Sequence, residues 1–197
     1  AASYTTPYHD LTLLRKALDE HLEKLGPPER SVADLIAEFD VPIEDPFTKS
    51  MMSMGMQHPG PKNRVWAAVD LGRLGPLAGQ ATGVLVECLL GLAFDVASAA
   101  AWALGRIGQR EQYVIDALVE TLWRDPAAST LAQLGAIDAL HDQLKHGPLN
   151  HKVQAALGLG EAGDAASDAV PTLLEGLEDK DEHLRAACSL ALRQLGV

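Results

Sequence analysis

The sequence predicts an all-α protein built as a right-handed α-α superhelix, a solenoid of stacked helical hairpins, with a helical and partly irregular N-terminal extension. Three observations support this fold class. The 47% hydrophobic content comes mainly from Ala and Leu, which are strong helix formers, and only 5% of residues are aromatic. One helical pattern recurs along the chain, and each copy of it ends in Gly. We therefore divide the 197 residues into an extension, 1–62, and a repeat domain, 63–197.

The first helix of each repeat is rich in Ala. Leu71 of the first copy aligns with Leu104 of the second, which lies 33 residues further on, and Gly163 and Gly196 of two later copies are again 33 residues apart. Glycine tolerates the left-handed conformation found just past helix ends, so each copy is expected to stop there. The copies are 65–75, 98–108, 153–163 and 185–196.

A second helix, rich in Leu and Val, follows the first. Apolar residues recur there at helical spacing, and Leu89, Leu122 and Leu177 occupy equivalent positions. One hairpin cannot bury its own apolar face, so neighbouring hairpins must stack to form a continuous core. The expected second helices are 82–90, 115–123, 137–145 and 170–178.

One repeat is short. Leu144 lies 22 residues beyond Leu122 instead of 33, so eleven residues are missing, about three helical turns. We assign this loss to the first helix of that repeat, which leaves a short helix at 127–134 that begins at Asp125 and Pro126, because Pro suits a first helical turn. The shortened helix should bend the stack near 125–150. The alternative is a gap in the sequence without structural consequence.

The extension does not show the repeat. Residues 9–25 have the pattern of an amphipathic helix, which Gly26 and two prolines end, and Ser31 can cap a second helix that continues to Phe39. Residues 41–63 form a Pro-rich arm that carries four methionines between positions 51 and 56. Flexible Met side chains suit both irregular packing and adaptable binding surfaces, so this arm either packs across the first repeat or contacts a partner.

The repeat resembles a known family. The motif Ala-Trp-Ala-Leu-Gly-Arg-Ile-Gly at 101–108 and the segment 169–177 resemble the HEAT-like repeats first associated with phycobilin lyases. The resemblance covers about two thirds of the chain, and it implies a HEAT-like solenoid. Such repeats serve many unrelated adaptors and accessory subunits, so the resemblance alone assigns no activity.

Charge argues against several partners. The net charge is −11, and Asp and Glu outnumber Lys and Arg in both parts of the chain, by 10 to 6 in 1–62 and by 17 to 10 in 63–197. Nucleic acids and anionic membranes both favour a cationic surface, so neither is an expected partner. The longest apolar stretch, 84–96, contains two acids and is too short to span a bilayer. The sequence shows no secretory signal, although it begins at Ala1, and we expect a cytoplasmic protein.

Acidic residues recur on the second helices. Right-handed helical solenoids usually line their concave side with these helices, so we expect an acidic ladder along one groove, to which a basic or amphipathic segment of a partner protein binds. Trp and Arg near the ladder are residue types common in binding hot spots. The alternative is an acidic face that only keeps the protein soluble. The ladder is Glu87, Glu120, Asp142 and Glu175, and the neighbouring candidates are Asp116, Trp123, Arg124 and Glu178.

We predict a non-catalytic protein-binding scaffold without a catalytic residue, metal site or cofactor. His141, His146 and His151 follow at five-residue spacings that do not place adjacent members on one helix face, so a metal site is disfavoured. Gly158, Gly160 and Gly163 resemble a dinucleotide-binding pattern, but no strand precedes them.

The competing function follows from the family resemblance, which would make the chain an accessory or catalytic subunit of a chromophore-attaching lyase. Cys88 is then the plausible thiol, because it aligns with Thr121 and Gly176, which we expect to face outward. A HEAT-like DNA-repair glycosylase is a third class, and it would require a basic concave surface. The sequence does not predict the oligomeric state.

Overall fold

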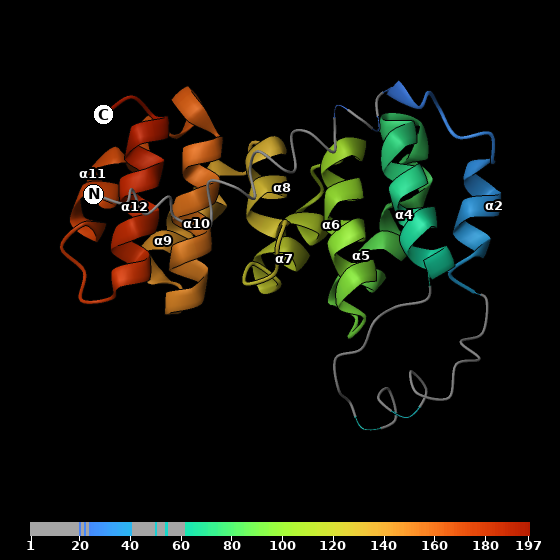
Figure 1. Ribbon diagram of the computed structural model, residues 1–197, viewed down its shortest axis with the longest axis horizontal. Helices are drawn as coiled ribbons and strands as arrows, with labels where there is room; N and C mark the ends of the chain where they lie inside the picture. Colours follow the sequence, from blue (N-terminus) through green and yellow to red (C-terminus); the bar gives the residue numbers. More distant parts are fainter. Residues whose placement is uncertain (1–19, 21, 23, 41–49, 51–53, 55–61) are drawn as a thin grey trace, which may run out of the picture.

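The computed structural model describes residues 20, 22, 24–40, 50, 54 and 62–197. Within these residues the protein is helical, and no β-strand forms (Figure 1). The all-α solenoid predicted from the repeats is therefore confirmed. No helix in this part of the chain is both long and apolar enough to cross a membrane.

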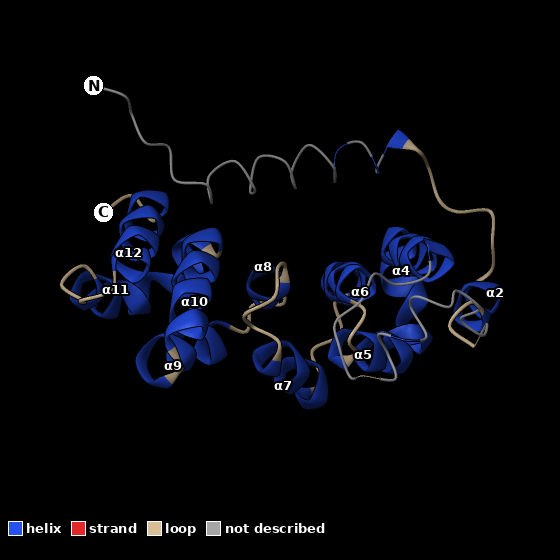
Figure 2. Ribbon diagram, turned by 60° about the horizontal axis from the view of Figure 1, so that its bottom comes forward, coloured by secondary structure: helices blue, strands red, loops and turns tan. Residues whose placement is uncertain are grey.

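The repeat helices form two layers (Figure 2). One layer contains the first helices of five successive repeats, which are α4 (Lys62–Leu74), α6 (Phe94–Ile107), α8 (Ala127–Gln133), α10 (Leu149–Glu161) and α12 (Glu182–Gln194). The other layer contains the second helices, which are α5 (Thr82–Leu90), α7 (Gln112–Glu120), α9 (Ile137–His146) and α11 (Val170–Gly176). Two 3₁₀ helices, η1 (Gly75–Ala81) and η2 (Gly163–Ala169), connect the layers in two of the repeats.

The first helices pack against one another backbone to backbone. A Cβ atom on Gly160 of α10 would lie 2.7 Å from the Cα of Ala191 in α12, and one on Gly72 of α4 would lie 3.0 Å from the Cα of Ala103 in α6. Gly72 and Gly160 occupy the same repeat position, directly after a fully buried leucine. Glycine at this position therefore allows a close approach that any larger residue would prevent.

The close approach of one layer determines the curvature. Successive second helices contact each other much less than successive first helices do. Figure 2 shows the array as an arc, with α7 and α9 along its outer side and the first helices along its inner side. The expectation that the second helices line the concave side is therefore wrong, because the small residues that draw helices together lie on the first helices.

The eleven residues missing from the short repeat are absent from two places, not from the first helix alone as predicted. Each first helix is followed by a glycine with positive φ, at Gly75, Gly108, Gly135, Gly163 and Gly196. The successive spacings of these glycines are 33, 27, 28 and 33 residues. Six of the eleven missing residues therefore precede Gly135 and five follow it, so the prediction that all eleven come from the first helix is wrong.

The six residues come from the beginning of α8. This helix has 7 residues where α6 has 14, and its first residue, Ala127, is equivalent to Ala100 inside α6. The five residues come from the connection to α9, which begins at Ile137 without a 3₁₀ helix. The predicted short helix at 127–134 is thus confirmed, and it lies in the part of the arc where α7 and α9 are outermost (Figure 2).

Side-chain hydrogen bonds tie α8 to its neighbours. Thr130 Oγ1 donates to the Ala101 carbonyl of α6 at 2.9 Å, and Ser98 Oγ of α6 donates to the Asp125 carbonyl at 2.9 Å. Thr130 is buried, so its hydroxyl needs such a partner. A helix of two turns contributes little packing area, and these bonds fix its position in the stack.

The extension is described only in part. Helix α2 (Val32–Ala37) is capped by Ser31, whose Oγ accepts from the Asp34 backbone N–H at 3.2 Å, so the predicted cap is confirmed. Three of the four methionines, all except Met54, lie outside the described residues, as does most of the predicted helix 9–25.

Replacing Gly160 with Ala should lower the free energy of unfolding by roughly 1–3 kcal/mol, since the new methyl group must push α12 away from α10. Gly83 in α5 is the matched control, because a Cβ there meets no atom within 4 Å. Gly83→Ala should raise stability by up to about 1 kcal/mol through helix propensity. Urea denaturation followed by circular dichroism measures both; equal stability of the two variants would contradict the close packing of α10 and α12.

Candidate functional site

The four ladder acids are exposed on four neighbouring helices. Glu87 lies on α5, Glu120 on α7, Asp142 on α9 and Glu175 on α11. The apolar residues of the same helices, such as Leu85, Leu118 and Leu140, are buried against the first-helix layer. Amphipathic packing thus turns the four carboxylates to solvent, on the outer side of the arc.

The two layers carry opposite charge. The second helices contain the acids Glu87, Asp116, Glu120, Asp138, Asp142 and Glu175 against the single base Lys145. The first helices contain the bases Lys62, Arg64, Arg73, Arg106, Lys152, Arg185 and Arg193 against the acids Asp70, Asp95, Glu161 and Glu182. The negative charge of the repeat helices is therefore concentrated on the outer layer.

The two additional acids predicted for this surface are also exposed. Asp116 lies one turn before Glu120 on α7 and accepts a hydrogen bond from Gln112 Nε2 at 2.8 Å. Glu178 follows the end of α11, where its backbone N–H donates to the Glu175 carbonyl at 3.1 Å. Both lie within a turn of a ladder acid.

Trp123 and Arg124 have different roles in the structure. Trp123 is 43% exposed, and the Arg124 guanidinium lies 4.7 Å from the centroid of its ring. Arg124 Nη1 donates to the carbonyls of Gly91 at 2.8 Å and Leu89 at 3.2 Å, at the C-terminal end of α5. Arg124, predicted as a partner contact, thus faces the protein and holds the indole in place.

A group of exposed apolar side chains near Trp123 was not predicted from the sequence. This apolar edge consists of Leu90, Leu92, Phe94 and Trp123. Leu90 is the equivalent residue of the preceding repeat, 33 positions earlier, and it is 45% exposed. The Arg124 guanidinium contacts both the Trp123 ring and the carbonyls of Leu89 and Gly91, so Trp123 lies near the end of α5 that carries Leu90. Leu92 and Phe94, in the next residues of the chain, are exposed as well. The repeat alignment places Leu90 opposite Trp123, but the sequence of a helix rich in Leu and Val does not distinguish an exposed leucine from a core leucine.

The thiols lie in apolar surroundings. Cys188 is buried and Cys88 is half-buried, and burial raises the pKa of each thiol to about 11. Thr121, predicted to mark an outward-facing position equivalent to Cys88, is buried, and its hydroxyl donates to the Ala117 carbonyl at 2.8 Å. The outward orientation inferred for this position is therefore wrong. A thiol with a raised pKa is a poor nucleophile at neutral pH.

Two of the three histidines considered for a metal have protein partners. His141 Nε2 lies 2.9 Å from Thr172 Oγ1, and His151 Nδ1 lies 3.0 Å from Gln143 Oε1. Burial lowers the pKa of His151 below its usual value, which favours the neutral ring. Among the described residues no group of three or more His, Cys, Asp or Glu side chains is placed to hold a metal ion.

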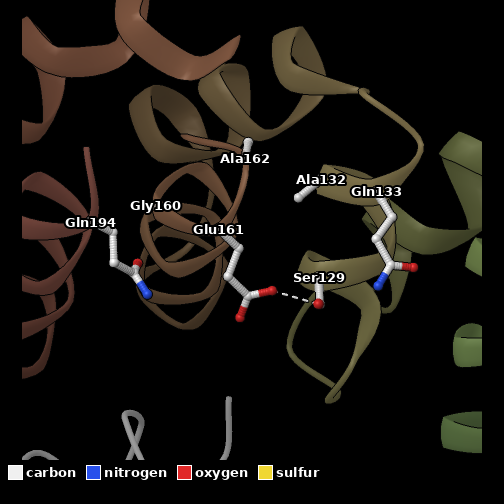
Figure 3. Close-up of a pocket in the computed structure, with 7 residues that line it drawn as sticks. All are labelled: Ser129, Ala132, Gln133, Gly160, Glu161, Ala162 and Gln194. Atoms are coloured by element: carbon white, nitrogen blue, oxygen red, sulfur yellow. Dashed lines mark hydrogen bonds between the residues drawn. The ribbon is translucent and has the colours of Figure 1, made fainter. Parts of the chain in front are cut away.

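A polar pocket opens on the first-helix layer (Figure 3). It has a volume of about 480 Å³ and lies where α8, α10 and α12 end. Among the described residues of the lining, Glu161 is the charged one, and its Oε2 accepts a hydrogen bond from Ser129 Oγ at 2.5 Å. The lining consists of Ser129, Ala132 and Gln133 from α8, Gly160, Glu161 and Ala162 from α10 and its C-cap, and Gln194 from α12.

Comparison with known families agrees with the architecture. Residues 137–197 match the family described as HEAT repeats, and residues 96–122 match the PBS lyase HEAT-like repeat. The two matched segments are therefore similar to HEAT-like repeats, as the motif at 101–108 indicated. None of the curated proteins matches it.

Cys88 is expected to react with iodoacetamide at pH 8 at least about tenfold more slowly than a free thiol, because raising its pKa from 9.0 to about 11 leaves little thiolate. The rate should keep rising up to about pH 11. Mass spectrometry of native protein, with the denatured chain as control, measures the modification. Fast alkylation of native Cys88 at pH 8 would contradict this environment.

Proposed function

We propose that the protein is a non-catalytic binding scaffold that holds a basic or amphipathic segment of a partner protein on the outer layer of its second helices. The observation that supports this most is the exposure of Glu87, Glu120, Asp142 and Glu175 at one equivalent position of four neighbouring helices. A regular row of carboxylates offers a partner the same charge contact in each repeat. Complementary charge of this kind selects partners and speeds their association.

The positions of these acids within their helices favour binding over simple solubility. Carboxylates stabilise the first turn of a helix and are unfavourable in its last turn, where the backbone carbonyls already carry partial negative charge. Glu120 is the last residue of α7, and Glu175 is the next to last residue of α11. A surface selected only for solubility would mix both signs and place its acids in first turns. Docking of a cationic segment would offset the repulsion between these carboxylates and the backbone carbonyls at the helix ends.

The apolar edge specifies the partner further. Leu90 and Trp123 each follow a ladder acid, Glu87 or Glu120, by three residues, so an apolar and an acidic group lie close together in two successive repeats. Arg124 holds the indole in one orientation, which reduces the conformational entropy that binding would cost. A segment with basic residues beside an apolar stripe would satisfy both features.

Charge reversal in the double variant Glu120→Lys, Glu175→Lys should weaken partner binding at least about tenfold, since two attractive contacts become repulsive. The matched control is Glu29→Lys, Glu182→Lys, which changes two exposed acids outside the second helices by the same net charge. Quantitative affinity capture from the native source identifies proteins that the control retains and the ladder variant loses. Equal retention by both variants would reject the acidic surface.

Trp123→Ala should reduce the affinity for the captured partner about tenfold or more, as expected for an aromatic hot spot. Tyr113→Ala on α7 is the control, because Tyr113 is similarly exposed, at 48% against 43% for Trp123. Calorimetric titration with the purified partner gives both affinities. If the two variants lose affinity equally, the apolar edge has no special part in binding.

The second candidate function is an accessory role in a chromophore-attaching lyase. It is favoured by the match of residues 96–122 to the PBS lyase HEAT-like repeat. The protonated state of Cys88 at neutral pH argues against this thiol as the attacking group. Absorbance titration with a bilin separates the two candidates, because only the lyase function requires the spectrum of the chromophore to change.

A further inference from the structure

A row of mainly apolar residues runs along the inner side of the arc. Each first helix carries a buried core leucine four residues before its terminal glycine. The residue two positions earlier lies about 200° further around the helix, so its side chain points away from the second helices, which form the other layer (Figure 2). This inner stripe consists of Val69, Trp102, Ser129, Leu157 and Leu190.

The inner stripe is covered at the C-terminal end of the array. A Cβ atom on Gly176 of α11 would meet the Sγ of Cys188, so this face of α12 packs against the second-helix layer. Leu190, two residues further on, points in nearly the opposite direction, yet it is only 5% exposed. An apolar side chain on the inner side stays buried to this extent only where other groups cover it.

The described part of the extension reaches the inner side. Arg73, two residues before the terminal glycine of α4, donates through Nη2 to the Gly26 carbonyl. Leu22 is 9% exposed, whereas Glu20 and Lys24 on either side of it are exposed. One face of this stretch is therefore covered and the other faces solvent, as in an amphipathic helix.

The sequence before Gly26 continues the same pattern. The helix predicted at 9–25 has its apolar side at Leu11, Leu14, Leu18 and Leu22. At 1.5 Å per residue this helix would be about 25 Å long, or two to three spacings of about 8–10 Å between packed helices. Starting from Gly26 on α4, it would extend as far as α8 or α10. Residues 1–8, at up to about 3.3 Å per residue, are long enough to continue to α12.

Charge runs in matching order along the two surfaces. The position two residues before each terminal glycine, which also faces inward, is basic on α4 and α6, at Arg73 and Arg106, and acidic on α10, at Glu161. The segment contains three acids and one base in 19–24, next to Gly26, and two bases without an acid in 15–18. A helix that runs from α4 toward α10 would thus bring unlike charges together at both places.

We propose that residues 1–25 form a strap along the inner side of the solenoid, with the apolar side of helix 9–25 on the inner stripe. The strap is an intramolecular ligand, so its effective concentration keeps the inner side occupied without a partner. A partner protein reaches this side only by displacing the strap, whereas the outer layer stays accessible. The strap does not depend on the acidic surface of the second helices.

A spin label on the full-length chain tests where the strap lies. Thr12→Cys places a thiol off the apolar side of the helix, and labelling near pH 7 favours it because burial raises the pKa of Cys88 and Cys188 to about 11. ¹H–¹⁵N NMR should show stronger broadening of amides in α8 and α10 than in α7 and α9. Broadening between a spin-labelled chain and a separate ¹⁵N-labelled chain would mean docking on a second copy, which overturns the intramolecular strap.

Leu18→Ser should speed trypsin cleavage after Arg15 and Lys16 at least about tenfold, because it removes an apolar contact that holds the strap in place. Leu13→Ser is the matched control, since Leu13 lies about 140° around the helix from Leu18, on the polar side. Cleavage of each variant in urea corrects for the change of sequence near the cut.

Leu190→Ser tests the other surface and should also speed cleavage after Arg15. Leu77→Ser is the control, because Leu77 is 79% exposed on η1. Cleavage after Arg193 reports opening of α12 itself, and it should stay slow in both variants.

Equal cleavage of Leu18→Ser and Leu13→Ser, or broadening confined to the extension, would overturn the proposal. Neither result bears on the outer surface, whose acids are intact in these variants. Conversely, the lysine variants of Glu120 and Glu175 leave the strap and the inner stripe unaltered, so the two hypotheses fail separately.

Discussion

The close packing of the first helices is the constraint on which the rest of the structure depends. Ala and Gly at their contacts let α4 approach α6, and α10 approach α12, until backbones touch. The second helices carry larger Leu and Val side chains and stay further apart. A stack with one tight and one loose layer must curve toward the tight layer, and this curvature places the second helices on the outside of the arc.

The distribution of charge follows from this geometry. Widely spaced second helices expose much of their surface, and like charges on neighbouring helices repel less at larger separation. In the tight inner layer, a side chain at a helix end can reach the next helix, as Glu161 of α10 does where it accepts a hydrogen bond from Ser129 of α8.

Much of the fold could be predicted because it depends on periodicity. The 33-residue offset, the terminal glycines, the short helix α8 and the Ser31 cap are all local patterns that the structure retains. The curvature could not be read from periodicity, which tells which residues share a face but not which layer packs more tightly. Gly72 and Gly160 carried that information, since each lies in the middle of a packed face where glycine otherwise weakens a helix. The sequence analysis also did not identify Gly135 as a terminal glycine, although it follows the first helix of the short repeat.

The candidate sites, like the curvature, could be predicted only where they depend on the pattern within one helix. Exposure of the four ladder acids followed from their polar positions, whereas the role of Arg124 depends on carbonyl groups at the end of α5 that no side-chain pattern reveals. Glu161 was recognisable as a break in a series of arginines, but its hydrogen bond from Ser129 depends on the packing of α8 against α10. In both layers, carboxylates stand near C-terminal ends of helices, where they oppose the backbone dipoles. A fold stabilised mainly by apolar burial tolerates such positions at a small cost, and a cationic partner segment bound to the outer layer would offset the part of that cost that arises there.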